Sequence, residues 1–125
     1  MKQGLPPNTF GTDLHRFSMN AGMKDMLNVM SKYMAMGMSF KDVIKTATWN
    51  AAKAVKHEEL GNLSEGSVAD IAVIRIRDGK FGFVDAGGNV IEGNKKLEAE
   101  LTLRAGNVVW DLNGISAKKI NGDLK

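Results

Sequence analysis

The chain of 125 residues has no cysteine, and its only histidines are His15 and His57. Disulfide bonds and thiolate zinc sites are therefore excluded, and the two histidines form neither a His-x-His nor a His-Glu-x-x-His pair. No apolar run approaches the roughly 18 residues of a membrane-spanning helix, and the first residues lack the apolar core of a signal peptide. From these absences we expect a soluble, cytoplasmic protein that contacts no membrane.

Aromatic residues are also scarce, at 6% of the chain. The formal net charge is +3, but the 17 lysines and arginines are scattered, and their longest clusters are the pairs Lys95-Lys96 and Lys118-Lys119. A nucleic-acid surface usually combines a basic stripe with aromatic side chains that stack on bases. Because no aromatic residue adjoins either lysine pair, we expect a solvated surface and no nucleic-acid partner.

Hydrophobic residues make up 43% of the chain, which is enough to build a core, and the length corresponds to one domain. The chemical pattern changes along the chain. Residues 1–58 have the pattern of a loop followed by helices, and residues 59–114 have the pattern of strands separated by glycine turns. Residues 115–125 form a polar tail that we expect to fray.

Helical spacing predicts a first helix over residues 23–37, which Gly37 ends. Its apolar stripe comprises Met23, Met26, Leu27, Met30 and Met34. A methionine stripe can form an adaptable binding surface, but helical stripes usually face a core, and we favour the core. Ser39 with Asp42 approximates a capping box that starts a second helix, and Asn50 predicts the cap of a short third one.

Strand patterns occupy the second half of the chain. Residues 71–74, IAVI, have the pattern of a buried strand, and Asp78-Gly79 predicts a hairpin turn after it. Residues 97–104 alternate strictly between apolar and polar side chains, which predicts a strand with one apolar face. Gly106-Asn107 predicts the turn into a last strand.

The stretch GTDLH, residues 11–15, places Asp13 two residues before His15. In an extended segment the two side chains would point to the same side, since strand side chains alternate. A hydrolytic metal site needs about three protein ligands or more, so this pair alone is too few. The alternative is a strand-end turn in which Thr12 and Asp13 accept hydrogen bonds from the backbone.

Other catalytic patterns are missing from the sequence. No serine lies in a G-x-S-x-G elbow, and the glycines do not have the spacing of a phosphate-binding loop. His57, beside Glu58 and Glu59 at a predicted helix end, has the position of a cation favoured by the helix dipole. By its own residues, the sequence does not assemble a complete active site.

One longer stretch is more informative. Residues 43–74, VIKTATWNAAKAVKHEELGNLSEGSVADIAVI, resemble the C-terminal signature of the amidohydrolase superfamily. These are metal-dependent hydrolases such as dihydroorotases, hydantoinases, N-acyl amino acid deacetylases and adenine deaminases. The matching residues are Ala47, Thr48, Asn50, Ala52, Leu60, Gly61, Leu63, Gly66, Ala69 and Asp70. The resemblance extends over residues 9–114, and TDLH before a methionine-rich helix is most similar to the deacetylase-like and dihydroorotase-like branch.

The resemblance implies an α/β fold in which residues 1–58 hold the last βα unit of a TIM-like (β/α)8 barrel. Residues 59–114 would form C-terminal strands of a small β-sandwich, so that the chain as it stands would be an α+β fragment. It also implies hydrolysis of a C–N bond in a small amide or cyclic amide by a metal-activated water, with a divalent metal, zinc, as cofactor. Asp13 matches the aspartate that follows the eighth strand, binds the metal and shuttles a proton. His15 and the loop through Gly22 would lie near the substrate.

The sequence departs from the family in two ways. Ala51 stands where the family has proline. The family's His-x-His, its bridging carboxylated lysine and two further histidines would all precede Met1. We therefore expect a fragment that is inactive and holds no metal unless a remaining barrel segment or a homo-oligomer completes the site. The alternative is a non-catalytic α+β domain that serves binding or oligomerisation.

Overall fold

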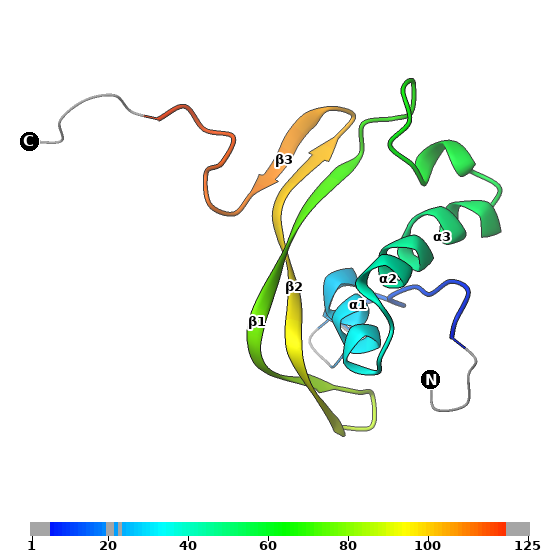
Figure 1. Ribbon diagram of the computed structural model, residues 1–125, viewed down its shortest axis with the longest axis vertical. Coiled ribbons are helices and arrows are strands. Elements are labelled where there is room, and N and C mark those ends of the chain that lie inside the picture. The colour runs from blue at the N-terminus through cyan, green and yellow to red at the C-terminus, as the bar shows by residue number, and fades with distance from the viewer. Residues whose placement is uncertain (1–5, 20–21, 23, 120–125) are drawn as a thin grey trace, which may run out of the picture.

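The structure is a computed structural model and describes residues 6–19, 22 and 24–119. Three helices come first: α1 (Met26–Ala35), α2 (Phe40–Ala47) and α3 (Trp49–Ala54), followed by a short 3-10 helix, Glu58–Leu60. Three strands follow: β1 (Ile71–Val84), β2 (Val90–Arg104) and β3 (Asn107–Asp111). They form one antiparallel sheet in the order β1-β2-β3, beside which the helices lie (Figure 1). No helix in the described part of the chain has the length and apolar character needed to cross a membrane.

Local capping interactions define both ends of helix α1. The Asp25 carboxylate caps its start by accepting from the Asn28 backbone N–H at 2.7 Å. Met23, the predicted first residue, lies outside the described residues, but the predicted start is wrong, because Lys24 has φ +54° and Asp25 is the N-cap of a helix that begins at Met26. The predicted stop at Gly37 is confirmed, because Gly37 has φ +99° and Met38 N–H donates to Tyr33 O at 3.0 Å. This is a Schellman arrangement, in which the left-handed residue favours glycine.

The core lies between α1, α2 and β2. Met30, Val43 and Leu97 are 3%, 0% and 2% exposed and contact one another. The partly buried side chains packed against them include Met26, Leu27, Met34, Ile44, Ala47 and Ile74. The methionine stripe therefore faces the core, as the helical spacing predicts.

Of the caps predicted for the next two helices, one is confirmed and the other is wrong. The predicted cap of α2 is confirmed, since Ser39 Oγ accepts from Asp42 N–H at 3.1 Å and donates to the Asp42 carboxylate at 2.6 Å. The predicted cap at Asn50 is wrong, because α3 starts at Trp49 and its N-cap is Thr48. Asn50 Nδ2 instead donates to Asn8 O at 2.8 Å, which joins α3 to the N-terminal segment.

Helix α1 protects an edge of the sheet. β3 pairs with β2 only at residues 101–104, and α1 runs along the earlier part of that strand (Figure 1). Ser31, which is fully buried, donates to Leu27 O at 2.6 Å and accepts from Leu97 N–H at 2.9 Å. The serine hydroxyl therefore takes the place of a strand partner at Leu97, where an unpaired N–H would otherwise be buried.

Two of the sequence predictions about β1 are wrong. The hairpin turn at Asp78-Gly79 is wrong: Asp78 pairs with Lys95 and Phe81 with Gly93, so two residues of β1 oppose one of β2. This is a β-bulge inside a continuous strand. The buried character of residues 71–74 is also wrong, because Ala72 and Val73 are exposed. Among the described residues β1 has a strand partner on one side only, which leaves it as an edge strand.

The chain reverses at residues 85–89 instead. Asp85 Oδ1 accepts from the backbone N–H groups of Gly87 and Asn89, each at 2.8 Å, and Oδ2 accepts from Asn89 Nδ2 at 3.0 Å. The Asn89 side chain above all, and these backbone groups, lower the pKa of Asp85 below its ordinary 3.8. The next turn lies one residue earlier than predicted, at Ala105-Gly106 instead of Gly106-Asn107. Both of its residues have positive φ, 47° at Ala105 and 78° at Gly106, and β3 begins at Asn107.

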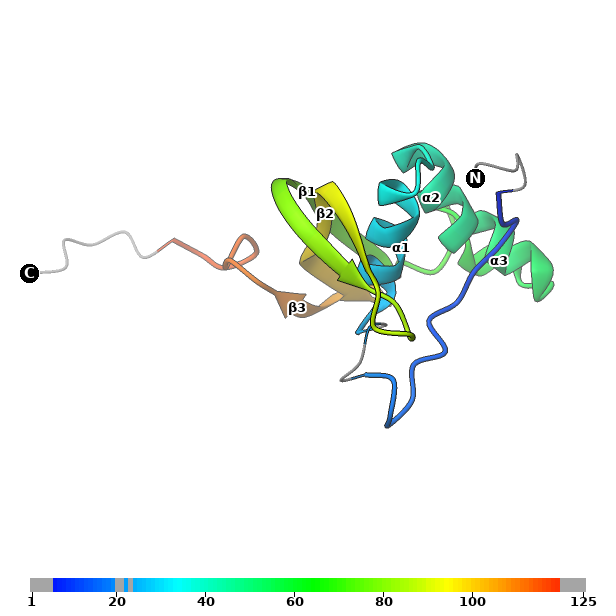
Figure 2. The ribbon, with the colours of Figure 1, turned by 90° about the horizontal axis from the view of Figure 1, so that it is seen from below.

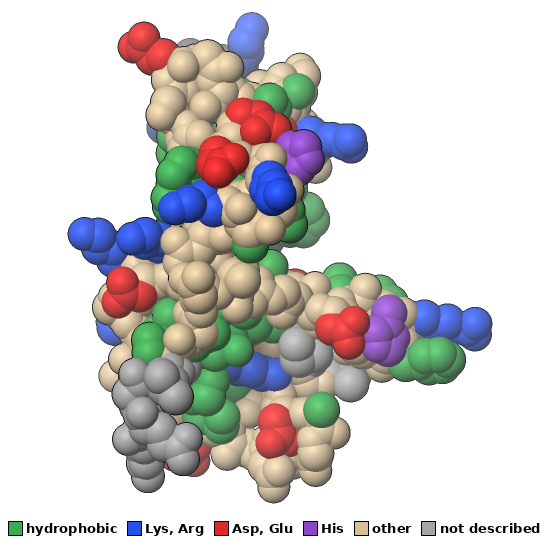
Figure 3. Space-filling view, turned by 90° about the vertical axis from the view of Figure 1, so that its right-hand side faces the viewer, with side chains coloured by type: hydrophobic (Ala, Val, Ile, Leu, Met, Phe, Trp, Pro, Cys, Tyr) green, Lys and Arg blue, Asp and Glu red, His purple; other side chains and the backbone are tan. Residues whose placement is uncertain are grey.

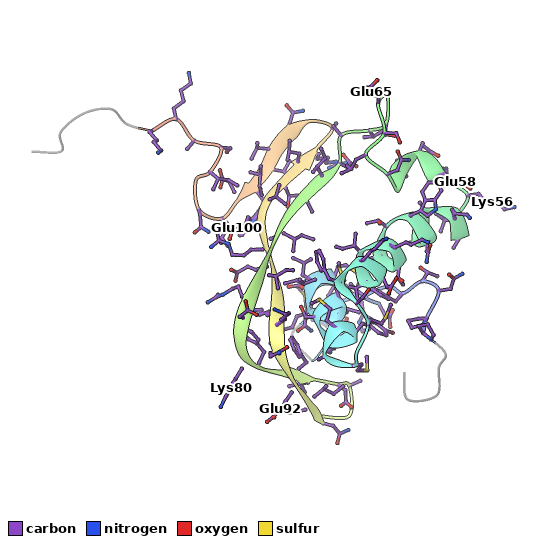
Figure 4. All side chains as sticks on the ribbon, viewed as in Figure 1. Lys56, Glu58, Glu65, Lys80, Glu92 and Glu100 are labelled. Atoms are coloured by element: carbon purple, nitrogen blue, oxygen red, sulfur yellow. The ribbon has the colours of Figure 1, made fainter. Side chains whose placement is uncertain are left out.

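An ion pair between the exposed side chain of Arg75 and the buried carboxylate of Glu100 joins β1 to β2. Glu100 is 4% exposed, and Arg75 Nε lies 2.7 Å from its Oε1 without hydrogen-bond geometry (Figure 4). Asn113 Nδ2 donates to the other oxygen of Glu100 at 2.8 Å. Desolvation offsets much of the attraction in such a pair, so it adds little stability, but it defines where these three segments meet.

The segment before α1 is not a strand. Residues 6–15, which hold the expected last barrel strand, have no strand assignment, and they run past the helices (Figure 2). A barrel strand satisfies its backbone through neighbours on both sides. Within the described residues Phe10 instead stacks on Tyr33 with ring centroids 4.5 Å apart. The structure therefore shows a mixed α and β chain with antiparallel strands, and the barrel unit and the sandwich stay predictions.

Replacing Ser31 tests the protection of the β2 edge. Ser31→Ala leaves the Leu97 N–H buried without its acceptor, so we expect a loss of about 1–3 kcal/mol in the free energy of unfolding. Urea denaturation followed by circular dichroism measures it. Ser64→Ala is the matched control, because Ser64 is exposed and the change there should stay within about 0.5 kcal/mol. Equal denaturation midpoints for the two variants would contradict the role of Ser31.

Acidification tests the Asp85 turn. A lowered folded-state pKa means that the stabilising contribution is complete above the ordinary value of 3.8 and is lost as the pH falls through the folded pKa. We expect Asp85→Asn to lower stability near neutral pH and to reduce its dependence on acid. NMR titration of the Asp85 carboxyl measures the pKa directly. A midpoint at or above 3.8 would show that these hydrogen bonds do not favour the carboxylate.

Candidate functional site

Two of the predicted site residues, Asp13 and His15, lie on a loop, residues 11–19, that projects from the helices (Figure 2). Two contacts hold the segment just before it. Phe10 stacks on Tyr33 of α1 with an interplanar angle of 14°, and Asn50 of α3 donates to Asn8 O. The loop thus leaves a segment that is attached to two helices.

Gly22 holds the other end of the loop. Its carbonyl accepts from Asn28 Nδ2 at 2.8 Å and also from Lys32 Nζ, both on α1. A Cβ at Gly22 would lie 2.3 Å from Val84 O, so this backbone touches the end of β1 too closely for any side chain. Gly22 therefore serves as a packing point between α1 and the β1–β2 hairpin.

Lys32 is an unusual partner for a carbonyl because it is 8% exposed. Burial lowers the pKa of its ammonium group, an effect that the Asp85 carboxylate opposes and the Lys24 ammonium reinforces. Long charged side chains are rarely buried without partners. Here the carbonyl of Gly22 and the field of Asp85 together accommodate the buried amine.

Asp13 and His15 are both exposed on the projecting loop. Asp13 has φ +46°, so the chain is not extended through it, and the expectation of period-two alternation from Asp13 to His15 does not hold. Thr12 Oγ1 accepts from Leu14 N–H at 3.2 Å, which confirms the predicted turn contact for Thr12. Among the described residues no side chain or backbone group bonds the Asp13 carboxylate.

Ser18 organises the loop from within. Its hydroxyl donates to Asp13 O at 2.8 Å and accepts from His15 N–H at 2.9 Å. Ser18 N–H and Met19 N–H both donate to His15 O, at 3.0 and 3.1 Å. The turn that follows Asp13 is therefore closed by one side chain and two backbone bonds.

The surface of the loop mixes charge with apolar area. The His15 and Phe17 rings meet edge to face at 6.2 Å, and the Arg16 guanidinium lies 5.7 Å from the Phe17 ring centroid. Phe17 is 79% exposed. In Figure 3 this loop is the lobe at the right, where acidic, histidine, basic and hydrophobic side chains gather. His57 lies elsewhere, with its Nδ1 2.8 Å from Glu59 Oε1.

The described residues do not by themselves fit a hydrolytic metal centre. Among them no group of three histidine, aspartate or glutamate side chains could hold a metal ion. Asp13 offers one carboxylate and His15 one imidazole, whereas catalytic zinc has three protein ligands. Asp13 and His15 are therefore too few to form such a centre by themselves.

Sequence patterns did not reveal four residues that shape this loop: Ser18, Asn28, Lys32 and Asn50. A serine in a polar loop favours local backbone contacts, which is the only prior signal for Ser18. Asn28 and Lys32 belong to the polar side of α1, and their acceptor, the Gly22 carbonyl, has no signature in the sequence.

Comparison with known proteins identifies the family to which this chain is similar. The model of the Amidohydrolase family matches residues 3–109. A deacetylase of Brucella anthropi is 34% identical over 98 residues, which cover 78% of this chain and 24% of that protein. The chain thus spans about a quarter of the length of this relative.

Solved structures agree with this match. A dihydroorotase is similar with a TM-score of 0.77 and 28% identity over 86% of this chain and 29% of that one. An adenine deaminase shares the fold, with a TM-score of 0.83 at 20% identity over 89% of this chain and 30% of that one. The family match includes the loop that carries Asp13 and continues through the helices into the sheet. The chain belongs to the amidohydrolase family.

Proposed function

We propose that this chain is the C-terminal part of a metal-dependent hydrolase that cleaves C–N bonds in small amides or cyclic amides. The family match over residues 3–109 supports the reaction class, and the deacetylase and dihydroorotase relatives point to these two kinds of substrate. Because the chain spans about a quarter of these relatives, the rest of the active site belongs to another segment or to a second copy.

Asp13 is the proposed ligand and proton carrier. The observation that carries the assignment is its exposed carboxylate, which no described residue engages, on a loop attached at both ends. In the proposed reaction this carboxylate accepts a proton from the attacking water and returns it to the leaving nitrogen. A divalent metal, zinc in our proposal, would make that water acidic when bound. His15, on the same loop, would face the substrate.

A second candidate function is non-catalytic association. Phe17, Leu63 and Val55 are 79%, 75% and 65% exposed, and apolar side chains in such positions favour contact with another surface. A binding or oligomerisation domain would use such exposed apolar side chains and would not need the Asp13 carboxylate. Metal binding therefore separates the two functions.

Zinc content tests the role of Asp13. After equilibration with Zn²⁺ and removal of excess metal, we expect about one zinc per dimer if a second copy completes the site, and none in Asp13→Ala, which lacks one carboxylate ligand. Elemental analysis measures it, alongside light scattering for the oligomeric state. Glu65→Ala is the control, because Glu65 is an exposed carboxylate that points away from the body of the protein (Figure 4). Equal zinc content in all three proteins, zero included, would contradict Asp13 as a metal ligand of this chain.

Replacing Gly22 tests its packing against the end of β1. Gly22→Ala would put a Cβ 2.3 Å from Val84 O, so we expect a loss of about 1–3 kcal/mol in unfolding free energy. Gly11→Ala is the matched control, since a Cβ there meets nothing within 4 Å. Thermal denaturation measures both variants. If Gly22→Ala were as stable as Gly11→Ala, the packing role of Gly22 would be wrong.

A further inference from the structure

We propose that Ser18 is a positioning residue whose hydroxyl fixes the backbone of Asp13 relative to His15, and so fixes where the Asp13 carboxylate is presented. The link to catalysis rests on the proposed function. The positioning itself depends only on the geometry of the loop.

The hydroxyl of Ser18 performs two tasks at once. It donates to Asp13 O at 2.8 Å, with His15 O as a second, longer acceptor at 3.3 Å, and it accepts from His15 N–H at 2.9 Å. A hydroxyl is the smallest side-chain group that both donates and accepts. In the described part of the loop, no other side chain bonds both Asp13 and His15. The two residues are thus joined through one oxygen atom.

The backbone of Asp13 has a strained conformation that the Ser18 hydroxyl can stabilise. Asp13 has φ +46°, in the left-handed region that non-glycine residues rarely adopt. Such a residue keeps its conformation only where its surroundings determine it. The side chain of Asp13 is exposed, and among the described residues its carboxylate has no hydrogen-bond partner, whereas its carbonyl accepts from Ser18. The hydroxyl is therefore an interaction that offsets the local strain at Asp13 directly.

Fixing the backbone matters for a metal ligand. The Phe10 stack and the Gly22 carbonyl anchor the loop only outside residues 11–19. A productive ligand must be held to within about 0.5 Å, and loss of a supporting hydrogen bond typically weakens metal affinity about 10- to 100-fold. We expect a loss of this size when the Ser18 hydroxyl is removed.

Two readouts test the bridge without any metal. Ser18→Ala should accelerate hydrogen exchange at the His15 amide, which loses its acceptor, and trypsin cleavage after the exposed Arg16. We expect increases of about tenfold or more, with an unchanged urea midpoint. Ser18→Thr keeps the hydroxyl and should restore wild-type rates, while Ser64→Ala should leave both rates unchanged. Wild-type rates in Ser18→Ala, or no rescue in Ser18→Thr, would overturn the proposal.

Zinc titration separates the bridge from the proposed function. If wild type binds zinc through Asp13, Ser18→Ala should weaken binding about 10- to 100-fold and Ser18→Thr should restore it. Unchanged zinc affinity in Ser18→Ala with a loosened loop would overturn the positioning of the carboxylate. If wild type binds no zinc, a second copy does not complete the site, and the exchange and cleavage rates still decide whether Ser18 holds the loop.

Discussion

The hydrogen bond from Leu97 N–H to the buried hydroxyl of Ser31 is the interaction on which the rest of the structure depends. β2 needs a partner along the part of its edge that β3 does not reach, and α1 supplies it. Once α1 is fixed there, Met30 meets Val43 and Leu97 in the core. The same helix then carries the residues that hold the site loop, so the position of Asp13 follows from how α1 meets β2.

Local chemistry made part of this fold predictable. Gly37 and the Ser39–Asp42 pair act within one helical turn, and the helical stripe with Met30 in it needs only a core to face. The predictions failed where distant partners decide. Asp78-Gly79 has the composition of a hairpin turn, but pairing with Lys95 keeps the strand continuous, and the chain reverses only at residues 85–89.

In the site, too, the sequence predicts local features better than features that distant partners determine. Spacing singled out the pair Asp13 and His15 but identified no complete set of ligands, and only the family resemblance gave Asp13 a role. Its neighbours Ser18, Asn28 and Lys32 act on backbone atoms, which carry no residue-specific signal. An amine such as that of Lys32 is expected at the surface by its type, and its burial follows from the carbonyl of Gly22 opposite it.

Backbone strain distinguishes the two functional proposals. A domain that only associates through apolar side chains such as Phe17 gains nothing from a left-handed Asp13 with an unengaged carboxylate. Strain of this kind costs on the order of 1 kcal/mol and persists where neighbouring bonds determine it. Here a serine oxygen bonds Asp13 within the loop, while a ring stack on Tyr33 and two donors to one glycine carbonyl hold the chain on either side of the loop. Such convergence on an exposed carboxylate is what a preorganised ligand requires, and it favours the hydrolase over the binding domain.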